Sequence, residues 1–559
     1  MTSAYHPLLN PTNRTITNCK TFYFVIAICV VTALVIFSTN RLNPHLIGYS
    51  SSSHSDLSSL SPNICHQSHD PQECLAFVSE VVCDGVAQQN GPILLKKFLK
   101  KYVHRMNHAI LETQKIMNQI NDQNEQGALE DCLDLLDLSV DRVTDSMMAL
   151  GGGTTRISYL NVQTWLSGAL TNHVTCFDGL NISGRKLMGE VVQDLISRAR
   201  ASLAMLAAVH TAPNEEEMMQ PLKGEAPSWL TLRDRKLLEK SAEDIKADAV
   251  VARDGTGDYK TIAEAVAAAP DKSKKRYVIY VKKGTYVENV EVTKKKKNLM
   301  IVGDGMDLTV VSGSLNVVDG STTFKSATLA AVGDGLILQD ICIQNTAGPE
   351  KHQAVALRVG ADQSVINRCR IDAYQDTLYS HSLRQFYRDC NVTGTIDFIF
   401  GNAAVVLQNC TLVPRLPMKD QKNMVTAQGR IDPNQNTGTS IQNCEIIASQ
   451  DLEPVKSSFP TYLGRPWKEY ARVAVLESYI GDEIDPAGWS VWSGDFALKT
   501  LYFGEYMNRG PGAGTSKRVN WTGFHVITEP SEAMKFTVAG LIQGGEWLPS
   551  TGVAYTEGL

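Results

Sequence analysis

The spacing of apolar residues divides the chain into two folded regions. Between about 62 and 210, apolar residues recur every three or four positions, as in PILLKKFLKKYVHRMNHAILETQKIMNQI. This period is typical of amphipathic helices. The segments GGGTT, from Gly151, and DGLNISG, from Asp178, interrupt the pattern. The region 62–210 is therefore predicted to be an antiparallel helical bundle.

From 248 to 559 the apolar residues form short β-rich runs, such as YVIYV, NLMIVG and LTVVSG, separated by Gly, Asp and Asn. A cysteine beside polar residues recurs in QDICI, NRCRI, RDCNV, QNCTL and QNCEI, with the cysteines at 342, 369, 390, 410 and 444. Steps of about 20 residues are typical of one coil of a parallel β-helix, and longer steps indicate coils with an inserted loop. We therefore predict an all-β parallel β-helix for 248–559.

Two of these segments, CRIDAYQDTLY and CNVTGTIDFIF, place Asp376 and Asp397 at the same distance after Cys369 and Cys390. Equivalent positions in neighbouring coils stack about 4.8 Å apart, so the two aspartates are predicted to face each other. Cys369, Cys390 and Cys410 are predicted to form a column, with neighbours inside the ~4.4–6.8 Å between Cα atoms that a disulfide requires. The spacing does not decide whether Cys390 pairs with Cys369 or with Cys410.

Two carboxylates about 5 Å apart cannot both ionise at low cost, because their repulsion raises the pKa of one of them. The pair then consists of a neutral acid beside a charged base or nucleophile, which suits hydrolysis. Stacked aspartates in a β-helix also cap turns or bind calcium, and this alternative stays open for the pair alone. Gln375, next to Asp376, and Gln353, about one coil earlier, add two amide donors that resemble an oxyanion hole.

The segment YLGRPW supplies Arg465 and Trp467. Arg465 could keep one aspartate ionised through a bidentate hydrogen bond, and Trp467 offers a flat face for a sugar ring. A retaining glycosidase also uses two carboxylates, ~5–5.5 Å apart, but it has little use for two amides directed at a developing oxyanion. The residues alone therefore favour ester hydrolysis by an aspartate nucleophile.

Length and charge add little to this picture. A chain of 559 residues agrees with two folded units. Its formal net charge of −6 gives no argument for a nucleic-acid partner. The basic run KKKK at Lys294–Lys297 is expected to be a solvated loop.

The N-terminal segment predicts entry into the secretory pathway. The 17 residues Thr21–Phe37 carry no charge, and they follow Arg14 and Lys20. We interpret 21–37 as an uncleaved transmembrane signal anchor, with 1–20 in the cytosol and a Ser-rich stem at 38–61. A cleaved signal peptide is the alternative. The cysteines can then form disulfides, and the candidate glycosylation sites are Asn181, Asn391, Asn409 and Asn520.

Residues 211–247 are rich in Pro, Glu and charge and are predicted to be a linker. Within this linker, the tetrapeptide RKLL is either a processing site or an ordinary charge cluster. It consists of Arg235, Lys236, Leu237 and Leu238.

Five separated motifs resemble the signature segments of plant pectin methylesterases: GTYVE, QAVALR, YQDTLY, DFIFG and LGRPW, in this order. The helical region resembles the pectin methylesterase inhibitor domain that precedes the enzyme in many plant members, including the segment Val162–Leu180. The resemblance implies a right-handed parallel β-helix at 248–559, preceded by an all-α four-helix-bundle inhibitor-like domain at 62–210. It also implies hydrolysis of methyl-esterified homogalacturonan to methanol and demethylated pectin, in cell wall modification.

The resemblance also assigns roles to single residues. Asp397 is the nucleophile, and Asp376 is the general acid that protonates departing methanol and then the base that activates water. Gln375 stabilises the oxyanion, and no metal or cofactor is implied. The substrate-binding residues are Thr323, in STTF, Gln353, Arg465, which also orients Asp397, and Trp467.

Three disulfides are implied by the resemblance, and Cys83 is left over. They are Cys390–Cys410, Cys65–Cys74 and Cys132–Cys176.

The implied partners are the pectin substrate, a subtilisin-like protease that cuts at RKLL, and proteinaceous pectin methylesterase inhibitors. The helical domain is expected to inhibit the enzyme before processing. The precursor would be membrane-anchored, and the mature enzyme would be a monomer in the extracellular cell wall. Two alternatives stay open: a polysaccharide lyase or galacturonase on the same fold, and an inhibitor or wall-binding protein that acts through 62–210, with invertases as another target.

Overall fold

The computed structural model describes residues 64–82, 91–151, 155–209 and 246–559. None of the helices in these residues is long and apolar enough to cross a membrane. The predicted anchor at 21–37, the RKLL segment and Cys83 lie outside the described residues.

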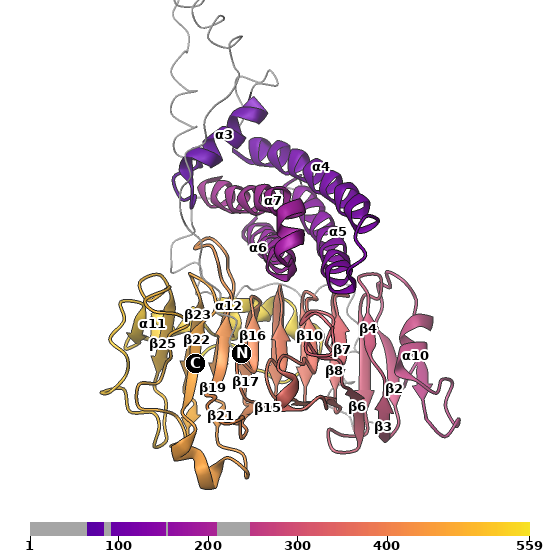
Figure 1. Ribbon diagram of the computed structural model, residues 1–559, viewed down its shortest axis with the longest axis vertical. Coiled ribbons are helices and arrows are strands. Elements are labelled where there is room, and N and C mark those ends of the chain that lie inside the picture. Colours follow the sequence, from indigo (N-terminus) through magenta and orange to yellow (C-terminus); the bar gives the residue numbers. More distant parts are fainter. Residues whose placement is uncertain (1–63, 83–90, 152–154, 210–245) are drawn as a thin grey trace, which may run out of the picture. The chain divides into compact units, whose positions relative to one another are not determined.

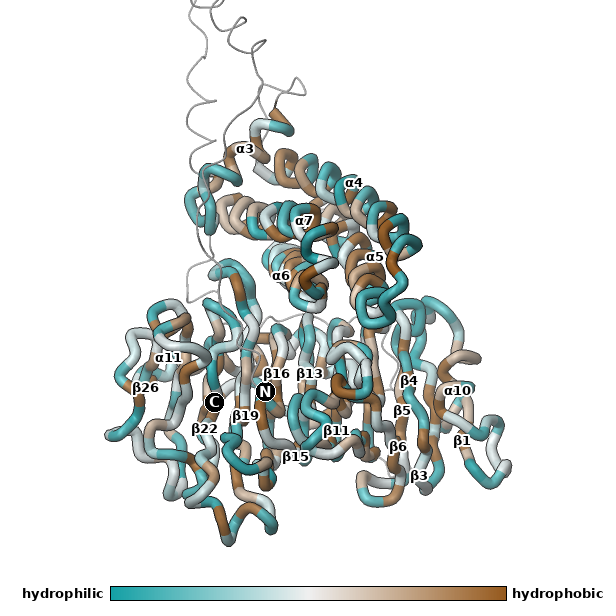
Figure 2. Tube along the Cα trace, viewed as in Figure 1, coloured by the Kyte–Doolittle hydropathy of each residue, from teal (hydrophilic) through white to brown (hydrophobic). Residues whose placement is uncertain are grey.

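In the part of the helical region that the structure describes, a short helix is followed by four long ones (Figure 1). Their apolar faces meet in a core that includes Phe98, Leu135, Leu166 and Leu203, as the 3.6-residue period predicts. Figure 2 shows the resulting alternation of hydrophobic and hydrophilic positions along each helix. The helices are α3 (Pro71–Val82), α4 (Gly91–Met117), α5 (Gln123–Gly151), α6 (Arg156–Gly179) and α7 (Ile182–Val209).

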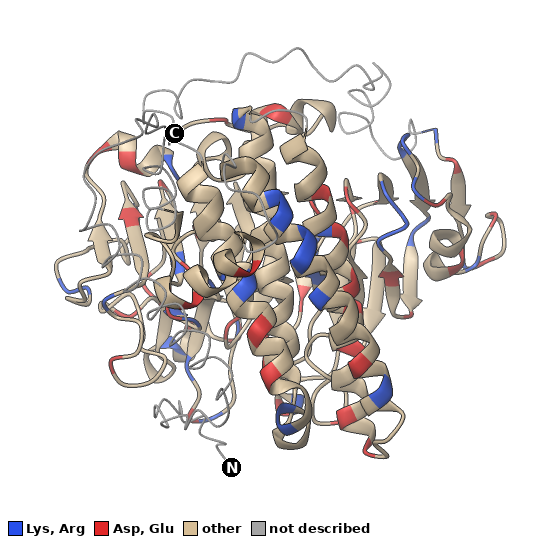
Figure 3. Ribbon diagram, turned by 90° about the horizontal axis from the view of Figure 1, so that it is seen from above, with Lys and Arg blue, Asp and Glu red and all other residues tan. Residues whose placement is uncertain are grey.

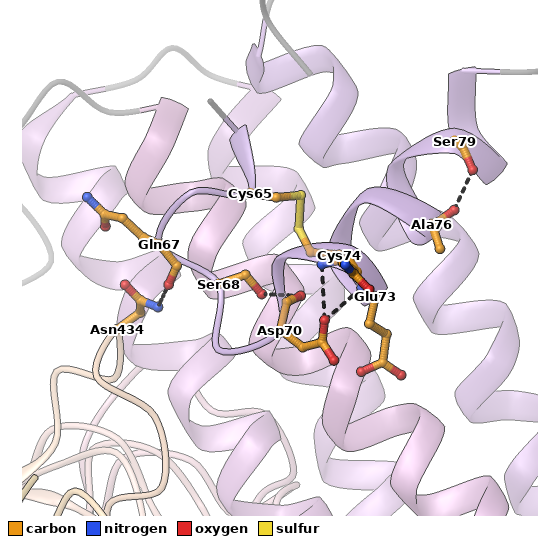
Figure 4. The surroundings of a disulfide bond; sticks show 10 residues. Cys65, Gln67, Ser68, Asp70, Glu73, Cys74, Ala76, Ser79 and Asn434 are labelled. Carbon is orange, nitrogen blue, oxygen red and sulfur yellow. Dashed lines mark hydrogen bonds between the residues drawn. A yellow bond between two sulfur atoms is a disulfide. The ribbon is translucent and has the colours of Figure 1, made fainter. Parts of the chain in front are cut away.

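Both disulfides expected in the helical region are present, Cys65–Cys74 and Cys132–Cys176. The first connects the segment before α3 to α3 itself (Figure 4). Next to it, the Asp70 carboxylate accepts hydrogen bonds from the backbone N–H groups of Gln72 and Glu73, at 3.0 and 2.9 Å, and so caps α3. The second disulfide connects α5 to α6.

The region from 249 onward contains three sheets in which every pairing between strands is parallel. A complete coil contributes one strand to each sheet, which is the arrangement of a parallel β-helix, whereas the coils at the two ends contribute fewer strands. Short helices accompany it: α10 (Ile262–Ala268), α11 (Pro530–Met534) and α12 (Val538–Ile542).

The strands of the three sheets are given in their spatial order. The eleven-stranded sheet consists of β1 (Ala249–Val251), β2 (Tyr277–Val281), β5 (Leu299–Gly303), β8 (Ile337–Gln339), β11 (Ser364–Asn367), β14 (Arg384–Arg388), β17 (Ala404–Gln408), β20 (Gly438–Gln442), β23 (Arg472–Leu476), β25 (Tyr502–Tyr506) and β26 (Phe524–Val526). The seven-stranded sheet consists of β22 (Thr461–Pro466), β19 (Asn423–Gln428), β16 (Ile399–Gly401), β13 (Leu378–Ser380), β10 (Leu357–Val359), β7 (Leu329–Ala331) and β4 (Val290–Val292). The eight-stranded sheet consists of β24 (Tyr479–Ile480), β21 (Glu445–Ile446), β18 (Thr411–Pro414), β15 (Asn391–Gly394), β12 (Arg370–Asp372), β9 (Cys342–Asn345), β6 (Thr309–Gly313) and β3 (Gly284–Val287).

Columns of apolar side chains fill the interior of the β-helix. In the seven-stranded sheet Leu329, Leu357, Leu378 and Ile399 pair in register and are at most 1% exposed. Each such side chain stabilises the fold by about 1.5–3 kcal/mol relative to an exposed one. Because side chains alternate between faces, the residue after each of these positions points outward.

The predicted column of Cys369, Cys390 and Cys410 is present and continues to Cys444, since each follows its paired strand at the same distance. Cys342, which the sequence repeat groups with these cysteines, lies one residue after the equivalent position in its own coil. Cys342 pairs with Arg370, and the column position is held by an isoleucine, Ile341. A shift of one residue reverses the face to which a strand residue points.

The disulfide implied between Cys390 and Cys410 is absent, because both are free thiols. Each sulfur contacts the main chain of the preceding coil. Cys410 Sγ lies 3.4 Å from the Cys390 backbone nitrogen, and Cys390 Sγ lies 3.3 Å from the Ile366 carbonyl oxygen. Each thiol is therefore held by packing in the core and by a contact with the main chain, and not by a covalent bond.

The helical region and the β-helix share one cluster of buried apolar residues, which includes Leu166 and Leu170 of α6 and Phe324 and Tyr379 of the β-helix. Residues 57–559 form one compact unit. Polar contacts accompany the apolar ones, and Figure 3 marks the charged residues of both regions. The guanidinium of Arg142, in α5, donates two hydrogen bonds to the Asp334 carboxylate.

The basic run at 294–297 is a turn, as expected, but it is only partly solvated, because Lys294 takes part in these contacts. Lys294 Nζ lies 2.7 Å from carboxylate oxygens of both Asp137 and Asp141, in α5. Lys297 Nζ lies 3.1 Å from the Asp334 carboxylate. Acidic side chains of α5 and of the β-helix region therefore replace part of the water around this run.

Candidate active site

Asp376 and Asp397 occupy equivalent positions, each two residues before a strand that begins with a paired apolar residue, Leu378 or Ile399. Both aspartates adopt the left-handed conformation, with φ of 64° and 52°. This conformation is uncommon outside glycine, although aspartate tolerates it better than most residues. The shared turn brings the two carboxylates to the same edge of neighbouring coils, as the sequence predicts.

The two carboxylates have different electrostatic surroundings. Arg465, in β22, donates from Nε to Asp397 Oδ1 at 2.8 Å and from Nη2 to Asp397 Oδ2 at 2.7 Å. Burial, and then the negative charge of Asp397, raise the pKa of Asp376 well above its usual value. The pair therefore contains an ion-paired carboxylate and a carboxyl group that favours its neutral form.

The two glutamines lie at the same edge. The backbone N–H of Ala354 donates to the Gln375 carbonyl at 3.2 Å, which places Gln353 one residue out of strict register with Gln375. Both glutamine side chains are half-buried. No hydrogen bond ties either amide to another residue that the structure describes, so both amides can donate to a bound ligand.

Aromatic side chains form a continuous outer surface beside the aspartates. Tyr379 and Phe400 stack with their ring centres 4.2 Å apart, and Phe400 meets Trp467 edge to face at 6.0 Å. On the other side Tyr379 contacts His381, with 5.1 Å between ring centres. Such flat apolar faces suit sugar rings. The sequence interpretation identified only Trp467, although the outward positions of YQDTLY and DFIFG would have indicated Tyr379 and Phe400.

Helix α6 covers this surface. The Thr175 hydroxyl lies 2.9 Å from His381 Nε2, and the Asp178 carboxylate lies 2.6 Å from Lys468 Nζ. Asp376 and Asp397 are only 8% and 6% exposed. The two carboxylates therefore have little contact with solvent in the uncut chain.

The other predicted site residues are dispersed. Thr323 is half-buried near the surface that α5 covers. Of the glycosylation candidates, Asn181, Asn409 and Asn520 are exposed, whereas Asn391 is half-buried in β15. Within the described segments, no group of three or more His, Cys, Asp and Glu side chains is arranged to bind a metal ion.

Two family models match the chain. Residues 248–545 match the model described as pectinesterase, and residues 59–210 match the model described as plant invertase/pectin methylesterase inhibitor.

Full-length relatives have similar sequences over most of their length. The chain is 67% identical to pectinesterase 2.1 of Solanum lycopersicum over 89% of this chain and 90% of that protein. It is 59% identical to a pectinesterase/pectinesterase inhibitor of Ficus pumila var. awkeotsang, over 90% and 92%. It is 52% identical to pectinesterase/pectinesterase inhibitor 18 of Arabidopsis thaliana, over 97% of both chains. Among solved structures, pectin methylesterase from carrot matches with a TM-score of 0.56 and 61% identity, over 56% of this chain and 99% of that one.

Proposed function

Because the chain belongs to the pectinesterase family and carries an inhibitor-type domain before the enzyme, we propose that it hydrolyses methyl esters of homogalacturonan to methanol and demethylated pectin. The observation that carries this proposal is the bidentate pair between Arg465 and Asp397, beside Asp376, whose pKa is raised by burial and by the charge of Asp397. An ionised nucleophile next to a proton donor is the arrangement that acyl transfer requires.

In the first half of the reaction, Asp397 attacks the ester carbonyl carbon. Arg465 pairs with the attacking carboxylate and fixes its orientation. Negative charge develops on the carbonyl oxygen, and the amides of Gln375 and Gln353 donate hydrogen bonds to it. Asp376 donates its proton to the departing methoxy oxygen, so that methanol leaves and an acyl-enzyme anhydride forms.

In the second half, Asp376 is ionised and accepts a proton from water. The resulting hydroxide attacks the acyl carbon, the bond to Asp397 breaks, and the galacturonic acid unit leaves and releases its carboxyl proton to solvent. Both aspartates then return to their starting protonation states. Trp467 and Thr323 are assigned to binding the polymer, Trp467 by stacking on a sugar ring.

The test replaces Asp397 by Asn, which keeps the shape of the side chain and removes the nucleophile. Methanol release is expected to fall at least about a thousandfold. Asp420→Asn is the matched control, because Asp420 is exposed and has a similar positive φ of 66°. Formation of reducing ends or unsaturated products without methanol would favour a galacturonase or a lyase instead.

We propose further that the helical domain inhibits the enzyme in the uncut chain. The contacts of Thr175 with His381 and of Asp178 with Lys468, which follows Trp467, support this, as does the low exposure of the two aspartates. A tethered domain has a high effective concentration over its site. Cleavage at Arg235–Leu238 by a subtilisin-like protease would separate the two domains, and Arg235→Ala with Lys236→Ala would keep the chain uncut.

The proposed route leads from a precursor anchored by 21–37 to a mature monomer in the cell wall. Its proposed partners are methyl-esterified homogalacturonan and other proteinaceous inhibitors.

A further inference from the structure

A buried guanidinium near the proposed active site has donors without partners. Arg358 lies at the centre of β10 and is 3% exposed, and its Cζ lies 3.5 Å from the centre of the Phe324 ring. Its Nε and Nη1 make no hydrogen bond with any residue that the structure describes. Leaving a buried charged group without hydrogen bonds is costly. The packing of the β-helix therefore does not explain why an arginine stands here.

The register places Arg358 on the proposed substrate surface. Ala330, Arg358, Tyr379 and Phe400 are paired positions of β7, β10, β13 and β16. Arg358 therefore points to the same face as the aromatic rings, one coil from Tyr379 and two from Phe400. The planar fork of an arginine matches a carboxylate, which accepts two parallel hydrogen bonds.

Acidic side chains of helix α5 lie over this position, but their hydrogen bonds and ion pairs go to neighbouring residues and not to Arg358. Asp131 Oδ2 accepts a hydrogen bond from the Thr322 hydroxyl at 2.5 Å, and the Asp134 carboxylate lies 2.6 Å from Lys325 Nζ. Asp131 Oδ1 is buried without a hydrogen bond to any described residue. No ion pair joins Asp131 to Arg358 among the described contacts. The helix thus brings a carboxylate toward Arg358, yet Asp131 Oδ1 and two guanidinium nitrogens of Arg358 keep no hydrogen-bond partner among the described residues.

We propose that Arg358, with Thr322 and Lys325, forms a subsite for the free carboxylate of an unesterified galacturonate unit, and that α5 covers this subsite in the uncut chain. The proposal rests on the function proposed above, because it assigns a unit of the same polymer. A methyl ester is neutral and offers weaker acceptors to a guanidinium. The enzyme would therefore favour polymers that already carry free carboxylates near the ester to be cleaved.

The first measurement is the binding of unesterified galacturonate oligomers, by titration calorimetry. All variants are made in the full chain and cleaved within 211–247 by limited proteolysis. Arg358→Gln is expected to weaken binding about tenfold, the effect of losing a charge-assisted contact. Arg370→Gln is the matched control, because Arg370 lies in the same coil on the eight-stranded sheet and pairs with Asp307 and Asp372. Its affinity should equal that of the parent chain.

The second measurement is kcat/KM for methanol release from partly de-esterified and from fully esterified homogalacturonan. The ratio of the two values should fall about tenfold in Arg358→Gln and stay unchanged in Arg370→Gln. Equal affinities in the calorimetry, or an equal loss on both polymers, would overturn the subsite. Arg358→Met, with an apolar side chain suited to a buried position, serves in its place if the Gln variant does not fold.

The two proposals fail in different ways. A parent chain that releases no methanol would defeat the esterase function, while calorimetry would still test the subsite. The covering by α5 has its own readout: the uncut chain should bind the oligomers at least tenfold more weakly than the cut chain. Equal binding before and after cleavage would refute the covering.

Discussion

Arg465 donates hydrogen bonds to both carboxylate oxygens of Asp397, at 2.8 and 2.7 Å. The neighbouring Asp376 has no such partner, and burial raises its pKa. One arginine therefore distinguishes two chemically identical side chains in equivalent turns. In the mechanism proposed above, this difference decides which aspartate attacks and which carries the proton.

Replacing Arg465 by Gln should lower stability as well as activity. The change leaves the Asp397 carboxylate buried without its cation, at a cost of about 1.5–3 kcal/mol. Urea unfolding at neutral pH measures this loss. Adding Asp397→Asn to Arg465→Gln removes the unpaired charge and should recover part of the stability. If the changes in unfolding free energy of Arg465→Gln and Asp397→Asn simply add in the double variant, the ion pair does not stabilise the fold as inferred.

Replacing Asp376 by Asn should stabilise the protein at neutral pH. The raised pKa means that the folded chain retains a proton on Asp376 that the unfolded chain releases. The stability contributed by the neutral group is full below the unfolded pKa, about 3.9, and is lost as pH rises toward the folded pKa. Asn stays neutral at every pH.

The stability difference between Asp376→Asn and the parent should therefore be near zero at about pH 4 and grow with pH. Urea unfolding at several pH values checks this trend. Asp420→Asn makes the same chemical change at an exposed left-handed position and should show no such growth. A constant difference across the pH range would contradict the raised pKa.

Much of the site could be predicted from the sequence because a β-helix repeats in strict register. The equal spacing of Cys369 to Asp376 and Cys390 to Asp397 survives folding, since each coil places its turn above the previous one. The same logic failed where a coil is shifted by one residue. Cys342 looks like a member of the repeat, but Ile341 takes the interior position.

Contacts between the two regions could not be predicted in this way. The residues in such contacts are almost two hundred positions apart, as in the pairs Arg142–Asp334 and Asp131–Thr322. No periodicity of the sequence connects a helix face to a strand of another region. Arg358 was part of a recognised motif, QAVALR, yet only the structure shows that its donors lack partners. The state of the thiols at Cys390 and Cys410 also depends on local geometry.

The contact of α5 with the β-helix should weaken as pH rises from about 4 to 6. Burial raises the pKa of Asp131 to about 6 from the usual 3.8, against the opposing effects of Thr322, Lys325 and Arg358. When α5 separates from the β-helix, this pKa should return toward its usual value. The contact therefore binds a proton in this window and loses up to about 3 kcal/mol across it.

Asp131→Asn should remove this pH dependence and strengthen the contact above pH 6, because the amide carries no charge to bury. The association of the two fragments after cleavage within 211–247 can be followed by analytical ultracentrifugation. Glu130→Gln, on the exposed side of the same helix, removes one charge without this effect. If Asp131→Asn weakens association at neutral pH, the ionised carboxylate contributes more than burial costs.

The disulfide between Cys132 and Cys176 should contribute to the inhibition of the uncut chain. It closes 44 residues between α5 and α6, the helices that cover Arg358 and the aromatic surface. Loop-closure entropy gives it about 4 kcal/mol of stabilisation, against about 2.6 kcal/mol for Cys65–Cys74, which closes only 9 residues. Replacing Cys132 and Cys176 by Ser should therefore loosen both covering helices and raise methanol release from the uncut chain. The corresponding change of Cys65 and Cys74, at the end of α3, should raise it less, and an equal rise would show that the two bridges stabilise the covering to the same extent. After cleavage and removal of the helical domain, both variants should be as active as the parent, because the β-helix is unchanged in each.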